Sequence, residues 1–257
     1  KQAYIDDVQH DLERLGLTWD QGPYFQRDRD AAYQSAFEAL QGRGLTYPCF
    51  CSRADLHAAS APHRGEKLVY PGTCRTLTPA QIAKRSQTKK PAIRLITPDS
   101  TVSLHDMIQG EYSQNLASEC GDFLIKRSDG AFAYQLAVVV DDAAQGVNCV
   151  VRGVDLLSST PEQIYLQRLL GLPECSYAHV PLLVAQKDRR LSKRDKDASI
   201  DVLMRDYKSA EAVIGHIAYI TGIVEFDEPA SPADLLSIFN LEKITEKWRG
   251  LIQIQWR

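Results

Sequence analysis

The residues AYQLAVVVDD at 133–142 and GVNCVVRGVD at 146–155 decide the fold of this chain. They hold two apolar runs, at 136–140 and 147–151, each too short for a long helix and each stopped by charge or glycine. Such runs are typical of buried strands in the parallel sheet of an α/β protein. Ligands bind such sheets where the strands end. The sequence therefore predicts a site made of the residues that crowd these ends: Tyr134, Asp141, Asp142, Arg152 and Asp155.

Composition excludes some classes of protein. A chain of 257 residues with 44% hydrophobic residues can bury a proper core, in one large domain or two modest ones. A net charge of −3 argues against a generally basic nucleic-acid binder, although Lys84, Arg85, Lys89 and Lys90 form a local basic patch. No apolar run approaches the roughly 18 residues of a membrane span, and the N-terminus lacks the core of a signal peptide. We expect a cytoplasmic monomer that does not bind membranes.

Helix and strand signals recur along the chain. Helices are expected over a stripe of Ile5, Val8, Leu12 and Leu15 that ends at Gly16, over 30–41, after Thr78-Pro79, from Ser159 to Gly171, before Gly222, and after Ser231-Pro232. Strands are expected at 45–47, 92–96 and 179–184. The first stripe has no preceding element to pack against, so we expect a further segment upstream of Lys1.

Cysteines mark a second candidate site. Cys49, Cys51 and Cys74 flank a stretch rich in proline and glycine that lacks regular periodicity and needs another source of order. Zinc takes four tetrahedral ligands and favours thiolates, which leaves one place for His57, His63 or Tyr70. The alternative is three buried thiols in a loop. Because the chain has no secretory signal, its six cysteines are expected to be thiols or metal ligands.

A basic stretch at 189–194, RRLSKR, follows the expected strand at 179–184. Packed positive charge on such a loop can neutralise a triphosphate, although most charge runs are simply solvated. Arg152 offers a planar fork that suits a carboxylate, and the Tyr134 hydroxyl can orient an amine or a carboxylate. Both residues also have a possible structural role. Tyr134 would be a core aromatic residue with a satisfied hydroxyl, and Arg152 would form an internal ion pair with Asp141, Asp142 or Asp155.

The order of these features resembles the catalytic half of glutamyl-tRNA synthetases, and most closely their shortened relatives, the glutamyl-Q tRNA(Asp) synthetases. The resemblance rests on the cysteine-rich insertion, AYQLAVVVDD, VVRGVDLLSSTPEQI, HVPLL and RLSKR, and it covers nearly the whole chain up to Lys193. RLSKR is similar to the KLSKS signature of the family. The resemblance implies a class I synthetase fold, a Rossmann-type parallel α/β sheet with a zinc-binding insertion and a C-terminal helical region.

The resemblance also assigns roles to residues. It implies that Lys193 is catalytic, that Arg190, Ser192 and Lys193 bind ATP, and that Tyr134 and Arg152 bind glutamate. Cys49, Cys51, Tyr70 and Cys74 match the zinc ligands of the shortened relatives, which selects Tyr70 over the histidines. The implied ligands are structural Zn²⁺, glutamate and ATP with Mg²⁺. The implied acceptor is the queuosine base of tRNA(Asp).

Two features depart from the family pattern. The HIGH-like signature of the first strand-loop-helix unit is absent, and we expect Lys1 to fall just downstream of it. The stretch 194–257 is too short for the anticodon-binding domain of a full glutamyl-tRNA synthetase, which favours the shortened relatives. The rival hypotheses are a fragment of a true glutamyl-tRNA synthetase, a non-catalytic zinc-containing RNA-binding module, and a nucleotidyl-transferring enzyme for another acid.

Four regions are expected. They are the remainder of the catalytic domain at 1–48, the insertion at 49–120, the second half of the catalytic domain at 121–198, and a helical region at 199–257.

Overall fold

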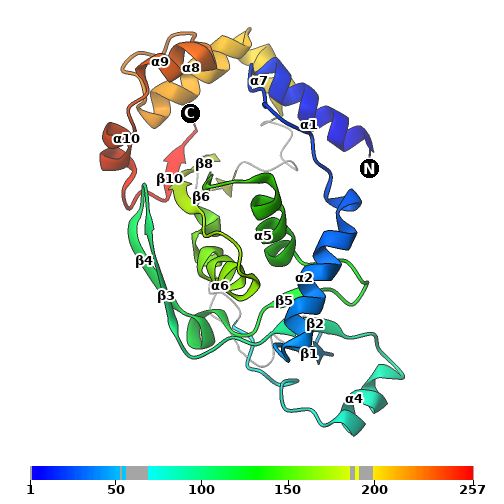
Figure 1. Ribbon diagram of the computed structural model, residues 1–257. Helices are drawn as coiled ribbons and strands as arrows, with labels where there is room; N and C mark the ends of the chain where they lie inside the picture. The colour runs from blue at the N-terminus through cyan, green and yellow to red at the C-terminus, as the bar shows by residue number, and fades with distance from the viewer. Residues whose placement is uncertain (1, 53, 56–68, 186–188, 191–198, 257) are drawn as a thin grey trace.

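The computed structural model of the chain describes residues 2–52, 54–55, 69–185, 189–190 and 199–256 (Figure 1). Its α-helices are α1 (Gln2–Arg14), α2 (Asp30–Gly42), α4 (Pro79–Ser86), α5 (Tyr134–Gln145), α6 (Thr160–Leu170), α7 (Ile200–Tyr207), α8 (Ala210–Thr221), α9 (Pro232–Ile238) and α10 (Leu241–Trp248). Its strands are β1 (Thr46–Cys49), β2 (Ala92–Leu95), β3 (Thr101–Asp106), β4 (Gly110–Asn115), β5 (Leu124–Lys126), β6 (Cys149–Gly153), β7 (Ser176–Val180), β8 (Leu182–Ala185), β9 (Arg189–Arg190) and β10 (Gln253–Gln255).

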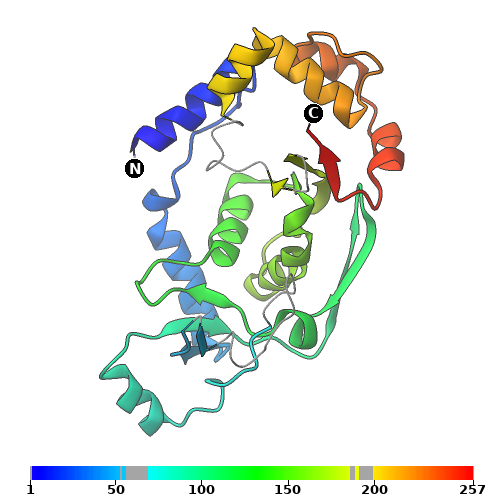
Figure 2. The same cartoon turned by 180° about the vertical axis from the view of Figure 1, so that it is seen from behind.

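The strands form three small sheets with the orders β1-β2-β5, β4-β3-β7-β6 and β10-β8-β9. Parallel pairing joins β7 to β6, β3 to β7, and β10 to β8. Helices α5 and α6 lie in the middle of the molecule, with α1 and α7–α9 at one end and β1, β2 and α4 at the other (Figures 1 and 2). The architecture is α/β with parallel strand pairs, as the sequence predicts.

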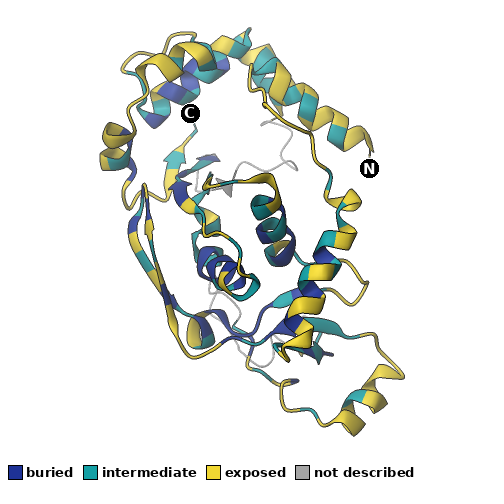
Figure 3. Ribbon diagram, viewed as in Figure 1, coloured by how far each residue is buried: buried dark blue, intermediate teal, exposed yellow. Residues whose placement is uncertain are grey.

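The main core lies where α2, α5 and α6 pack against β2 and β5. It is built from Phe37, Leu40, Leu95, Phe123, Ile125, Leu136, Val139 and Leu166, all buried. Figure 3 shows the contrast between this centre and α1, which has no buried residue. At the edge of the core, buried Asp141 on α5 accepts hydrogen bonds from Tyr33 (2.6 Å) and from Arg29. Asp141 therefore fastens α5 to α2, which is a structural role.

The apolar run at 136–140 is helical, so the prediction of a strand there is wrong. Leu136, Ala137 and Val139 are buried within α5, and Gly146 ends the helix in the left-handed conformation at φ 70°. A continuous apolar run does not separate a buried strand from a helix enclosed on several sides. The run continues into Ala143-Ala144-Gln145, whose residues favour helix. Tyr134 is therefore the first residue of a helix rather than a residue at a strand end.

The second run is a strand, but it lies at 149–153 and is not deeply buried. β6 is the last strand in its sheet order among the described residues, and Val151 is 66% exposed. Arg152 therefore lies within the strand and not after it. The expected strand at 179–184 is two strands, β7 and β8, in different sheets. Pro181 separates them because proline has no N–H to donate to a strand neighbour.

Helix signals were more dependable. The side chains of Thr78 and Ser231 each accept a hydrogen bond from the backbone N–H three residues on. The side chains of Gln81 and Asp234 in turn accept one from the backbone N–H of Thr78 and Ser231. Both helices carry proline at their start, as predicted. The helices at 30–42, 160–170 and 210–221 confirm the expected helices in those regions. Within the described residues, no helix has the length and apolar character needed to cross a bilayer.

Candidate functional site

Three cysteines meet at the end of β1. The sulfur atoms of Cys49, Cys51 and Cys74 all lie within 4.8 Å of one another, and the Tyr70 hydroxyl lies 3.5 Å from Cys49 Sγ and 3.8 Å from Cys51 Sγ. Cys51 and Cys74 are separated by 3.6 Å between sulfurs. A zinc tetrahedron with ordinary bond lengths has sulfur–sulfur and sulfur–oxygen edges of about 3.6–3.8 Å. The four side chains therefore have the spacing that one zinc ion requires, with the Tyr70 hydroxyl beside the three sulfurs.

Positive charge stabilises this cluster. Buried Arg94 on β2 donates from Nε to Cys49 Sγ (3.2 Å), and its guanidinium lies 3.7 Å from the centre of the Tyr70 ring. Burial raises the pKa of Cys49, but the hydrogen bonds that it shares with Arg94 and Tyr70 outweigh burial and leave the pKa below its usual value. Burial raises the pKa of Cys51 to about 11 and raises that of Tyr70 as well. A bound cation would supply the charge that ionises these groups.

We predict about one equivalent of zinc in the purified protein, as closure by four ligands requires. Cys74→Ser should abolish the binding and lower the melting temperature, because Cys49, Cys51 and Tyr70 would then lose the ion that holds their side chains together. Cys149→Ser, at an exposed cysteine outside the cluster, is the matched control. Metal analysis and thermal melting with and without a chelator make the measurement. A metal-free wild-type protein of undiminished stability would contradict the prediction.

Arg94 also connects the cysteine cluster to a cavity of about 330 Å³ beside α5. Its Nη1 donates to the carbonyl oxygen of Asp122 (2.5 Å), whose buried carboxylate accepts from Tyr47 (2.7 Å) and from the backbone N–H of Thr97 (2.7 Å). The cavity is lined by side chains from both regions, including Tyr70, Arg94, Asp122, Tyr134, Gln135 and Glu162. Tyr134 is 51% exposed, so it is not the core aromatic of the structural alternative.

The first turn of α6 links this cavity to Arg152. Gln135, next to Tyr134, donates to Glu162 (2.6 Å) and accepts from Gln163 (2.7 Å). Thr160, which lies two residues before Glu162 in α6, accepts a hydrogen bond from Arg152 Nη2 (2.9 Å). Thr160, Glu162 and Gln163 are all buried, so the turn is a fixed support. Among the described residues no hydrogen bond joins Tyr134 directly to Arg152, and the first turn of α6 connects their neighbourhoods.

Arg152 is held mainly by neutral acceptors. Nε donates to Nε2 of His179 (3.0 Å), and Nη2 donates to Thr160 and to the carbonyl oxygen of Leu156 (3.4 Å). Of the three acidic residues considered as its partners, Asp141 is engaged with Arg29 and Tyr33 instead. Burial raises the pKa of Asp142, and the nearby positive charge of Arg152 offsets only part of that rise. Within the described part of the chain, Nη1 donates no hydrogen bond to a protein acceptor. This end of the guanidinium can therefore receive a carboxylate.

The predicted phosphate-binding residues are only partly described. Arg190 lies in the short strand β9, where its backbone pairs with Val184 of β8. Ser192 and Lys193 fall outside the described residues, as do His57 and His63. Their roles stay predictions.

Sequence reasoning missed Arg94, Asp106 and His179. Each is a buried polar residue on a strand, and His179 is the first residue of the HVPLL motif. Buried charged residues are uncommon and are usually paired. The arginine of AIRLI and the histidine of YAHVPLL, each set among apolar neighbours, were the available signals.

Comparison with known proteins adds independent findings. The family described as tRNA synthetases class I (E and Q), catalytic domain, matches residues 1–246. The chain is 44% identical over 246 residues to a "Glutamyl-Q tRNA(Asp) synthetase" of Symbiobacterium thermophilum, with 91% of this chain and 76% of that protein covered. It is 49% identical over 207 residues to a protein of the same name from Thiobacillus denitrificans, with 80% and 66% covered.

Two solved structures share the fold. A glutamate tRNA ligase from Elizabethkingia meningosepticum, in complex with its amino acid, superposes with a TM-score of 0.75 at 21% identity. A glutamate-tRNA synthetase from Elizabethkingia anophelis gives a TM-score of 0.77, also at 21% identity. Both superpositions cover 98% of this chain, but only 57% and 58% of the solved chains. The chain thus spans somewhat over half the length of these two proteins.

Proposed function

This chain belongs to the family of class I tRNA synthetases for glutamate and glutamine, and from that premise we propose that it activates glutamate with ATP and transfers it to the queuosine base of tRNA(Asp). The observation that carries the proposal is the 44% identity over 246 residues to a protein named for that reaction. The likeness of the solved structures confirms the expected class I synthetase fold. The geometry around Arg152 and Tyr134 supports an amino-acid substrate that bears a second carboxylate.

The proposed chemistry has two steps. A carboxylate oxygen of glutamate attacks the α-phosphate of ATP, forming glutamyl-adenylate and releasing pyrophosphate; an acceptor group of the base then attacks the acyl carbon and releases AMP. The first step needs the α-phosphate in line with the attacking oxygen, so the amino acid must be held in a fixed position. Arg152 would bind the carboxylate that is not activated, and Tyr134 would orient the substrate from α5. Arg190, Ser192 and Lys193 would neutralise the phosphates, together with Mg²⁺.

The zinc site is proposed as structural. Four protein ligands leave no open position for water or substrate, so the ion would order residues 49–74 rather than catalyse. Arg94 would transmit that order to the cavity that contains Tyr134. We retain the four expected regions, at 1–48, 49–120, 121–198 and 199–257, as part of the proposal.

Glutamate-dependent exchange of pyrophosphate into ATP tests the activation step in the full-length protein. We expect exchange with glutamate, and much less with glutamine or aspartate, because Arg152 would bind a carboxylate at one distance from the reacting group. Exchange supported by another acid would favour a different nucleotidyl-transferring enzyme. Absence of exchange with every amino acid would favour a non-catalytic RNA-binding module.

Tyr134→Phe should raise the glutamate KM by roughly 3–10-fold, as for loss of one hydrogen bond worth about 0.5–1.5 kcal/mol. Melting should be little changed, because Tyr134 is half exposed and the phenyl ring is retained. Tyr219→Phe on α8 is the control, since Tyr219 is also partly exposed (42%) but lies in the helical region at 199–257. Equal KM values in Tyr134→Phe and wild type would remove the hydroxyl from the site.

A further inference from the structure

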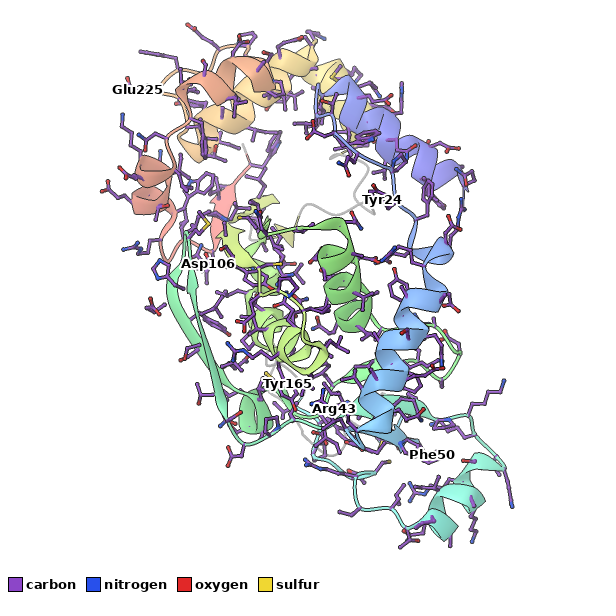
Figure 4. The ribbon with its side chains drawn as sticks, in the orientation of Figure 1. Tyr24, Arg43, Phe50, Asp106, Tyr165 and Glu225 are labelled. Carbon is purple, nitrogen blue, oxygen red and sulfur yellow. The ribbon has the colours of Figure 1, made fainter. Side chains whose placement is uncertain are left out.

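A row of three polar side chains crosses the four-stranded sheet. Asp106 ends β3, His179 lies in β7, and Arg152 lies in β6. The parallel register pairs Arg152 with His179 and brings Asp106 beside Tyr177 of the same strand as His179. Both Asp106 and His179 have side chains that are 0% exposed. Figure 4 labels Asp106 where β3 approaches the central strands. Two buried groups therefore stand directly behind the arginine proposed to bind glutamate.

Hydrogen-bond geometry fixes the tautomer of His179. Arg152 can only donate, so the imidazole Nε2 at 3.0 Å from its Nε must accept. The proton then lies on Nδ1, which donates to Asp106 Oδ2 at 2.6 Å. A hydrogen on Nε2 would face the Nε–H of Arg152 and repel it. The neighbouring carboxylate thus selects the form of the ring that can hold the guanidinium.

Asp106 itself is fixed in orientation. Its Oδ1 accepts hydrogen bonds from the backbone N–H groups of Ile108 (3.0 Å), Gln109 (2.8 Å) and His179 (3.1 Å). Burial raises the pKa of Asp106, but the hydrogen bond from the His179 ring and those from the three amides outweigh it, so the pKa is lowered. Only Oδ2 is left to face the imidazole. The carboxylate is therefore a stationary acceptor that cannot turn away from His179.

Hydrogen bonds at two nitrogens fix the orientation of the Arg152 guanidinium plane. His179 engages Nε while Thr160 and the Leu156 carbonyl engage Nη2, so two of the three nitrogens of Arg152 are held. The Tyr177 ring lies 5.3 Å below the guanidinium carbon and stacks on His179 at 6.1 Å. A planar group held at two nitrogens and supported on one face has one orientation. Its remaining nitrogen, Nη1, is presented in a single direction.

We propose that His179 and Asp106 are positioning residues for substrate recognition: Asp106 sets the tautomer of His179, and His179 holds Arg152 so that its free end meets the glutamate carboxylate. That glutamate is the substrate rests on the proposed function. The arrangement of Asp106, His179 and Arg152 rests on the geometry alone. A positioning role requires the acceptor at Nε2. A merely structural role requires only that the buried space and the partner of Asp106 be kept.

Two substitutions of His179 separate these roles. Asparagine can place its amide near the Nδ1 position and keep the bond to Asp106, but it offers no acceptor to Arg152. Glutamine can place its carbonyl oxygen near the Nε2 position and keep the acceptor. We expect His179→Asn to raise the glutamate KM about tenfold or more, with kcat changed by less than about threefold, because the loss is one of substrate binding. We expect His179→Gln to recover most of that loss.

Asp106→Asn extends the test at constant shape. Its carbonyl oxygen would take the three amide hydrogen bonds, and its NH₂ would face Nδ1 of His179, which moves the ring proton to Nε2. We expect a rise in the glutamate KM of about tenfold or more, as for His179→Asn, although residue 106 does not touch Arg152. His105→Gln is the matched control, because His105 is adjacent on β3 but pairs with Glu111 at the surface. It should behave as wild type.

Exchange kinetics of the full-length variants decide the recognition role. Raised KM in His179→Asn and Asp106→Asn with recovery in His179→Gln supports the proposal. Glutamate KM values equal to that of wild type in all variants overturn it. Equal losses of activity and of melting temperature in His179→Asn and His179→Gln also overturn it, because they indicate a structural role.

A spectroscopic measurement keeps this inference separate from the proposed function. Imidazole ¹⁵N–¹H correlation spectra of the protein should show His179 with its proton on Nδ1 in wild type and on Nε2 in Asp106→Asn. A wild-type His179 protonated on Nε2 overturns the inference whether or not the protein activates glutamate. The expected tautomers without glutamate-dependent exchange would instead reject the proposed function and leave the array in place.

Discussion

Replacing Arg152 with alanine should lower kcat/KM for glutamate about 100-fold or more, as when one partner of a hydrogen-bonded charge pair is removed at a cost of about 2–5 kcal/mol. Arg152→Lys should still raise the glutamate KM about tenfold, because lysine keeps the charge but loses the planar fork held by His179 and Thr160. Glutamate-dependent pyrophosphate exchange makes the measurement.

Melting temperatures distinguish recognition from folding in the same variants. Arg152→Ala removes the 3.0 Å hydrogen bond to the buried Nε2 of His179 and leaves that nitrogen only the longer contact with Thr160 Oγ1 (3.4 Å), so we expect a loss of about 1–3 kcal/mol in the free energy of unfolding. An arginine locked in a buried ion pair would instead cost about 3–5 kcal/mol. Arg127→Ala is the control, because Arg127 forms an exposed pair with Asp129. Unchanged glutamate dependence in both Arg152 variants would remove this residue from the site.

The second large effect is expected at Lys193. Lys193→Ala should reduce adenylate formation about 100-fold or more, as for loss of a preorganised charge at the transferring phosphate. The free energy of unfolding should stay within about ±0.5 kcal/mol of wild type, because the sequence predicts that Lys193 lies in a polar loop. Lys196→Ala makes the same charge change three residues beyond and outside the RLSKR signature, so it serves as the control. Full activity of Lys193→Ala would contradict a role of the basic stretch at 189–194 in binding phosphates and would favour the alternative that it is simply solvated.

Local signals predicted the parts of the fold that depend on local chemistry. Thr78-Pro79 and Ser231-Pro232 start helices because their side chains satisfy the first free N–H groups, and Gly171 and Gly222 end helices in the left-handed conformation. These interactions span only a few residues, so a sequence shows them directly.

The run at 136–140 shows where that reasoning stops. Val138, Val139 and Val140 favour strand by propensity, yet they lie in α5 because the helix is enclosed by α2 and α6. Tertiary burial outweighs a propensity difference of a few tenths of a kcal/mol per residue. The sequence offered no way to know that two helices would cover this run.

The candidate site likewise contains residues that local spacing predicts and contacts that only the fold creates. Cys49, Cys51 and Cys74 could be assigned from spacing, and the structure brings them together with Tyr70. The link from Asp106 to His179 joins residues 73 positions apart, and that from Arg94 to Cys49 joins residues 45 apart. Such pairs depend on sheet register and chain path, which a single sequence does not specify. The supports of the site therefore became visible only in three dimensions.

Transfer of glutamate to tRNA tests the central claim most directly. The full-length protein should be offered radiolabelled glutamate and ATP with tRNA(Asp) that carries queuosine, tRNA(Asp) that lacks it, and tRNA(Glu). We predict labelling of the queuosine-containing tRNA(Asp) alone, with loss of the label when the modified base is removed. Labelling of tRNA(Glu), or equal labelling of tRNA(Asp) with and without queuosine, would contradict the account.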